Sequence, residues 1–170
     1  MTKSSIAVVK LAAREVTSEN FKPYGQLITP SIDGKPYDCS DAQLNLSQGT
    51  PRFYIMRLTQ KGLKFHQFAR HQCCTQCLGS LAGKDWFLAV APPGDREQPE
   101  VDKIAAFCIP GNCFIKLEMG TWHAGPYFEH DVVDFYNLEL SNTNEVDRFT
   151  YNFRKNEGLE FEIYRRTKDE

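Results

Sequence analysis

The chain contains no stretch of helical apolar periodicity longer than about three turns. Short runs of apolar and β-branched residues recur instead, and Gly, Pro and Asn punctuate them. The clearest is the continuous apolar run 86–91, which ends at Pro92-Pro93-Gly94. Many short strands joined by turns bury their apolar faces by closing into a barrel or packing as a sandwich. The sequence therefore predicts an all-β fold with a few short helical turns.

The predicted strands follow this pattern along the whole chain. We expect strands over residues 8–11, 26–29, 53–58, 63–68, 86–91, 113–117, 132–140, 148–153 and 159–164, while residues 102–108 fit either a short helix or a strand. The N-cap residues of 17–21 predict a short helical turn that Pro23 and Gly25 stop. Gln60-Lys61-Gly62 is typical of a hairpin turn between the third and fourth of these strands. The polar stretch 30–51 predicts a long loop that could lie over the mouth of a barrel.

Length and charge narrow the class of protein. With 170 residues, the chain is long enough for one domain with a substantial core, which we expect to span residues 1–170. Twenty basic and 22 acidic residues give a formal charge of −2, which argues against binding to nucleic acid or to an anionic membrane. No apolar run approaches the roughly 20 residues that span a bilayer. A small-molecule ligand fits this profile best.

Six cysteines bear on the compartment and on metal binding. Cys73, Cys74 and Cys77 cluster in a chain that needs no disulfides at this size, which favours reduced thiols in a cytoplasmic protein. No secretory signal is evident, and an organelle is the alternative if a targeting segment has been removed. A zinc ribbon would pair Cys74 and Cys77 with Cys108 and Cys113, but the second pair has four intervening residues rather than two. Cysteines serving as small strand hydrophobes are the simpler interpretation.

Two histidine-bearing stretches are the candidates for chemistry. In the first, a glycine that can turn the backbone precedes Trp122 and His123, in the order Gly120-Thr121-Trp122-His123. The second runs from His71 to Gln76, two residues that regular strand alternation would place on opposite faces unless a turn or bulge intervenes. Either stretch alone is compatible with an ordinary hydrogen-bonded side chain. Together they predict one site at the mouth of the barrel.

These stretches, with others in the same order, carry a resemblance to a known family. The sequence resembles the cupin superfamily and, within it, the ureidoglycolate lyase family of ureide degradation. The matching parts are Phe21-Lys22-Pro23-Tyr24-Gly25-Gln26-Leu27-Ile28, Arg70-His71 with Gln76, Phe87-Leu88-Ala89-Val90-Ala91-Pro92-Pro93-Gly94, Ala106-Phe107, Gly120-Thr121-Trp122-His123 and Asp134-Phe135. The tail 138–154 is similar to the version found in plant and algal relatives.

The resemblance implies a fold, a reaction and a set of residues. The fold is a cupin-type β-barrel, a double-stranded β-helix. The reaction is that of a carbon-nitrogen lyase of allantoin degradation in purine catabolism, which cleaves ureidoglycolate to glyoxylate and urea by general acid-base chemistry. The implied catalytic residues are His71, His123 and Gln76. The implied substrate-binding residues are Arg57 and Arg70 as carboxylate clamps, with Trp122 and Glu139.

Departures from the superfamily pattern bear on cofactors. Ala69 stands where a metal-binding cupin has its first histidine, and Gln76 stands where it has the acidic ligand. Two imidazoles and an amide are a poor divalent site, so we expect no cofactor, with a divalent metal on His71, Gln76 and His123 as the alternative. Ala124 follows the Gly-Thr-Trp-His element, where the lyase family commonly has a second histidine.

Two other functions remain open from the sequence. One is a metal-dependent cupin enzyme, a dioxygenase or an isomerase, and the other is a cupin that binds small carboxylates without catalysis. We expect a homodimer, because a second copy would cover exposed barrel edges. Asp134 and Glu139 lie five apart on one predicted strand, so alternation places at most one of them inside the barrel.

Overall fold

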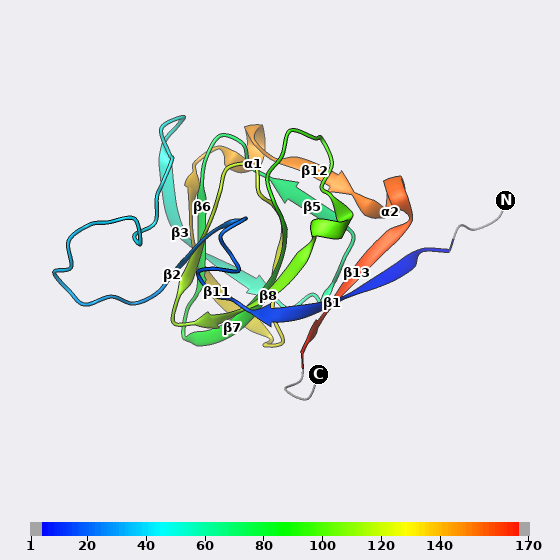
Figure 1. The fold of residues 1–170 in the computed structure, drawn as a ribbon, viewed down its shortest axis with the longest axis horizontal. Coiled ribbons are helices and arrows are strands. Elements are labelled where there is room, and N and C mark those ends of the chain that lie inside the picture. The colour runs from blue at the N-terminus through cyan, green and yellow to red at the C-terminus, as the bar shows by residue number, and fades with distance from the viewer. Residues whose placement is uncertain (1–4, 167–170) are drawn as a thin grey trace.

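A computed structural model of the chain describes residues 5–166 and shows a β-barrel made of two β-sheets (Figure 1). The larger sheet contains β1 (Ala7–Glu15), β4 (Lys64–Phe65), β5 (Gln67–Arg70), β7 (Gly83–Ala91), β8 (Ala105–Gly111), β10 (Trp122–Tyr127), β12 (Phe149–Asn152) and β13 (Leu159–Arg165). The smaller sheet contains β2 (Gly25–Ile28), β3 (Pro51–Thr59), β6 (Gln76–Ser80), β9 (Phe114–Leu117) and β11 (Val132–Leu140). The predicted all-β fold class is confirmed.

The spatial order of the strands differs from their order in the chain. The larger sheet runs β12-β5-β10-β7-β8-β1-β13-β4, and the smaller runs β2-β9-β6-β11-β3. The helical elements are short: a 3₁₀ turn η1 (Val101–Lys103), α1 (Thr143–Val146) and α2 (Phe153–Glu157). No helix within residues 5–166 combines the length and the apolar character needed to cross a membrane.

Most predicted strands are confirmed, but one predicted hairpin is wrong and one strand was missed. The prediction of a hairpin between β3 and the next strand is wrong. β3 pairs with β11, while β4 and β5 belong to the other sheet. Residues 102–108 are divided between η1 and β8. The strand β6 was not predicted. It reads QCLGS, a mixed run in which all five residues are nevertheless buried.

The polar stretch 30–50 is a loop, as predicted, but it projects away from the barrel and contributes no side chain to the cavity described below (Figure 1). Gln26 fixes the base of this loop by donating to the carbonyls of Cys39 and Asp41 at 3.2 and 3.3 Å. The loop therefore does not cover the barrel mouth.

The core explains why residues 86–91 of β7 are continuously apolar. Trp86, Leu88 and Val90 face the cluster between the two sheets, whereas Phe87 and Ala89 face a second cluster on the opposite side of β7. Trp86 contacts Phe135 of β11 edge to face, with ring centroids 5.2 Å apart, and this contact joins the two sheets. A strand buried on both faces needs apolar residues at every position.

The outer face of β3 is less covered. Phe53 and Ile55 expose 70% and 63% of their surface. A homodimer remains a prediction for this chain.

Candidate active site

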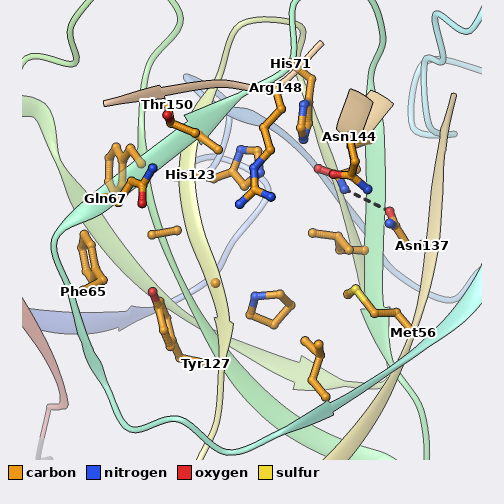
Figure 2. A pocket seen from close by; sticks show the side chains of 18 of the residues that line it. Met56, Phe65, Gln67, His71, His123, Tyr127, Asn137, Asn144, Arg148 and Thr150 are labelled. Atoms are coloured by element: carbon orange, nitrogen blue, oxygen red, sulfur yellow. Dashed lines mark hydrogen bonds between the residues drawn. The ribbon is translucent and has the colours of Figure 1, made fainter. Parts of the chain in front are cut away.

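A cavity of about 520 Å³ opens between the two sheets, at the end of the barrel where β3, β5, β6, β10 and β11 converge (Figure 2). Strands of the smaller sheet contribute Tyr54, Gln76 and Glu139, and His123 comes from the larger sheet. The polar side chains that line it are Tyr54, His66, Gln67, His71, Gln76, His123, Asn137, Glu139, Asn144, Arg148 and Thr150, together with Lys61 and Lys64.

The structure resolves how His71 and Gln76 share one site. His71 follows the last residue of β5 in the larger sheet, and Gln76 begins β6 in the smaller sheet. Residues 71–75 form no strand and carry the chain from one sheet to the other. Because the two residues belong to different sheets, strand alternation does not separate them, and both side chains reach the cavity.

A backbone contact joins the two histidine-bearing stretches. The N–H of Gly120 donates to the carbonyl of His71 at 2.7 Å. Gly120 has φ +83°, in the left-handed region that favours glycine. Thr121 then donates its hydroxyl to the carbonyl of Tyr24 at 2.8 Å. The turn thus fixes the start of β10 and the position of His123 within it.

His123 is held as a neutral imidazole. Its Nδ1 lies 3.2 Å from the carbonyl oxygen of Thr121, and because a carbonyl only accepts, Nδ1 carries the proton and donates. The pKa of His123 is lowered from its ordinary value to about 3, mainly by burial, with the charges of His71 and Arg148 acting in the same direction and the hydrogen bond to Thr121 opposing them. The remaining ring nitrogen, Nε2, is therefore a proton acceptor at neutral pH.

The second imidazole faces the first. The ring centroids of His71 and His123 lie 5.3 Å apart. Nδ1 of His71 donates to the carbonyl of Asp147 at 2.6 Å, so its Nε2 is also the ring nitrogen left for the cavity. The Asp147 carboxylate in turn accepts from the backbone N–H groups of Gln72 and Cys73 at 2.9 and 2.8 Å.

A buried network orients Gln76. Its Nε2 donates to Oδ1 of Asn137 at 3.0 Å and to the Glu139 carboxylate at 3.2 Å, so the amide cannot flip without losing both bonds. Tyr54 supports the network, with its hydroxyl 3.4 Å from Glu139 and accepting from Asn137 at 3.1 Å. The other amide atom, Oε1 of Gln76, is buried and has no hydrogen-bond partner within residues 5–166. A ligand N–H would satisfy it.

Arg148 is the site residue that the sequence did not single out. It lies just before β12, and its guanidinium points into the cavity beside His123 (Figure 2). Among residues 5–166 it makes no hydrogen bond or ion pair, although its charge acts on His123. A single Arg in a polar tail carries no periodic signal, and only the path of the chain after β11 brings it to the histidines.

A metal site remains an alternative for the cavity, with His71, His123 and Gln76 as its candidate donors. Residues 5–166 contain no group of three or more His, Cys, Asp or Glu side chains placed to hold a metal ion. His71, His123 and Gln76 offer two imidazoles and an amide oxygen, whereas catalytic zinc sites use three His, Cys or carboxylate ligands. All six cysteines are free, and Cys74, Cys77, Cys108 and Cys113 are buried.

Comparison with known proteins identifies the family of the chain. Residues 8–155 match the family described as ureidoglycolate lyase. The chain belongs to the ureidoglycolate lyase family. It is 23% identical to a ureidoglycolate lyase from Azotobacter vinelandii in an alignment of 125 residues that covers 66% of this chain and 74% of that protein.

The chain is also similar to one solved structure. It is the dTDP-6-deoxy-D-glucose-3,5-epimerase RmlC from Legionella pneumophila Philadelphia 1, in complex with dTDP-4-keto-L-rhamnose. It is 18% identical, with a TM-score of 0.37 over 66% of this chain and 53% of that chain. The chain thus spans about half the length of that epimerase.

The structure does not bring the two arginines suggested by the lyase-family resemblance to the cavity. Arg57 points outward from β3, is 75% exposed and forms a bidentate pair with Asp134 at 2.8 and 2.9 Å. Strand alternation explains this position, because Met56 and Leu58 on either side of it face inward. The same alternation along β11 places Asp134 outside and Glu139 inside, as expected.

Arg70 and Trp122 lie behind the site of this lyase-family chain rather than in it. Arg70 is 4% exposed and donates to the carbonyls of Gly94 and Arg96 at 3.2 and 3.0 Å. Its guanidinium lies 4.3 Å from the ring centroid of Trp122, which is buried on the face of β10 opposite His123. Both side chains support the strand that carries His123, and neither lines the cavity.

Proposed function

We propose that the chain is a ureidoglycolate lyase, which cleaves the C–N bond of ureidoglycolate to give glyoxylate and urea. The observation that carries this proposal is the placement of an unpaired Arg148 beside the His71–His123 pair in one cavity. Ureidoglycolate has a carboxylate, a hydroxyl and a urea group on one carbon. A cation, a base and an acid are the groups that its cleavage requires.

Arg148 binds the substrate carboxylate in this proposal. Its guanidinium has no competing carboxylate partner among the described residues, and it can grip a carboxylate through two parallel N–H···O bonds. The urea group then lies toward Gln76, whose buried Oε1 accepts from a urea N–H. Glu139 and Asn137 act as positioning residues, because they hold the Gln76 amide in the accepting orientation.

Proton transfer between the histidines completes the reaction. His123, neutral at physiological pH, accepts the hydroxyl proton at Nε2. The O–H electron pair forms the C=O bond of glyoxylate, the C–N electron pair leaves with the urea nitrogen, and His71 donates a proton to that nitrogen from Nε2. The proton that His123 gained restores His71 for the next turnover. No step uses a redox cofactor or a covalent intermediate.

The direct test measures glyoxylate released from ureidoglycolate by the purified protein, with and without a chelator. We expect turnover well above the spontaneous background and equal rates in both arms. Absence of turnover in both arms would refute the proposal, and binding of glyoxylate-like acids without turnover would indicate a carboxylate-binding cupin instead. Loss of turnover only with the chelator would restore the metal-dependent alternative.

A further inference from the structure

The cavity is larger and less polar than its proposed substrate requires. Pockets of roughly 300–1,000 Å³ bury drug-sized ligands, and this one measures about 520 Å³. Ureidoglycolate is much smaller and has no apolar group. If Arg148 and the histidines hold it, a large part of the cavity remains beyond it.

The remaining part has apolar side chains on several strands, although Lys61, Lys64, His66 and Gln67 also line the cavity. Along β3 the inward side chains are Tyr54, Met56 and Leu58, so the strand is polar at one end of the cavity and apolar at the other. On β6 the inward residue after Gln76 is Leu78. The two strands flank β11, which pairs Asn137 with both Tyr54 and Leu78.

The larger sheet repeats this division. On β10, His123 lies at the polar end and Tyr127 at the apolar end, where the Tyr127 ring stacks on Phe65 with centroids 5.9 Å apart. Figure 2 shows the same separation, with His71, His123 and Arg148 on one side of the cavity and Phe65, Tyr127 and Met56 on the other. Apolar side chains from both sheets thus form the wall of the cavity away from the histidines.

We propose that this wall, formed by Met56, Leu58, Phe65 and Tyr127, is a second subsite for the apolar end of a longer carboxylate. The ligand class is a carboxylate with an alkyl or aryl group at its far end, such as ureidoglycolate alkylated on its distal urea nitrogen. Cleavage of that compound follows the same course and releases glyoxylate and an alkylurea. The proposal rests on the proposed function for the placement of the carboxylate at Arg148.

The test is a titration with acetate, butanoate and hexanoate, measured by calorimetry at constant pH and ionic strength. Each methylene that enters an apolar subsite should tighten binding about three- to four-fold. Dissociation constants that do not fall with chain length in the unmodified protein would overturn the proposal.

Variants on one strand localise the effect. Met56→Gln and Leu58→Asn keep side-chain size but make the wall polar, and we expect either to flatten the chain-length dependence while acetate binding and ureidoglycolate cleavage change less than two-fold. Ile55→Asn is the matched control, because Ile55 lies between them in sequence but is 63% exposed on the outer face. It should keep the full dependence. If the dependence survives in both folded inward variants, the subsite is not there.

The subsite and the proposed function fail in different ways. Chain-length dependence without release of glyoxylate from ureidoglycolate would refute the lyase reaction and support the apolar subsite. Glyoxylate release with equal affinity for all three acids would support the lyase and overturn the subsite. Rates with N-butyl ureidoglycolate, compared between the unmodified protein and Met56→Gln, then show whether the subsite serves catalysis.

Discussion

The backbone N–H of Gly120 donates a 2.7 Å hydrogen bond to the carbonyl of His71. Through this bond the turn before β10 and the crossover between the two sheets hold each other in place. The side chains of His71 and His123 consequently reach one cavity, with their rings 5.3 Å apart.

Arg148→Gln should weaken the binding of substrate. A hydrogen-bonded charge pair contributes roughly 1.5–3 kcal/mol, so we expect KM to rise about 10- to 100-fold. Steady-state kinetics with ureidoglycolate provide the measurement. Arg57→Gln is the matched control, because that guanidinium pairs with Asp134 outside the barrel, and its KM should stay within two-fold. A larger effect of Arg57→Gln would move the carboxylate site to the outer face.

Replacing either cavity histidine should remove proton transfer. We expect His71→Gln and His123→Gln each to lower kcat about 10²- to 10⁴-fold, the range typical of general acid-base groups. His130→Gln serves as the control, because His130 pairs with Asp85 on the surface and lines no part of the cavity. Full activity in either cavity variant, with its fold verified by circular dichroism, would exclude that histidine from the reaction.

Acid should destabilise the protein in part through His123. Its pKa is about 3 when folded and 6.5 when unfolded, so between these values the unfolded chain binds the extra proton. The free energy of unfolding should therefore fall as pH decreases from 6.5 toward 3, by roughly 1 kcal/mol per pH unit from this group. Above pH 6.5 the ring is neutral in both states, so this group causes no loss of stability there.

Urea denaturation at several pH values can isolate this contribution. Carboxyl groups with lowered pKa, such as those of Asp85 and Asp134, also weaken the fold in acid. The relevant quantity is therefore the difference in slope between the unmodified protein and His123→Gln, which should be shallower between pH 4 and 6. Equal slopes would mean that His123 is not buried as a neutral ring.

Gly111→Ala should destabilise the junction of β7 and β8. An added Cβ would lie 2.2 Å from the carbonyl carbon of Gly83 and 2.5 Å from the nitrogen of Lys84, both of which are backbone atoms. Such overpacking costs about 1–3 kcal/mol, which thermal unfolding would detect. A Cβ on Gly94 meets nothing within 4 Å, so Gly94→Ala should leave the unfolding temperature nearly unchanged. Equal stability of the two variants would contradict the close approach of the two strands.

The apolar pattern was sufficient to locate most strands, because each buried strand must present apolar residues to a core. It failed at β6, where Gln76 and Ser80 are buried polar residues that donate hydrogen bonds through Nε2 and Oγ. The apolar pattern also does not predict which strands pair with each other. A turn signal at Gln60-Lys61-Gly62 predicts a hairpin, yet the partner of β3 is β11, far along the chain.

The sequence by itself determined the strand-rich class and pointed to His71 and His123. Alternation around Met56 and Leu58 already implied that Arg57 faces outward, a signal that the resemblance to the family had overridden. Only the tertiary structure decided which arginine serves the site and which residues share the cavity. Arg148 enters it because the chain turns back after β11, and a contact between residues distant in sequence depends on the packing of both sheets rather than on any local pattern.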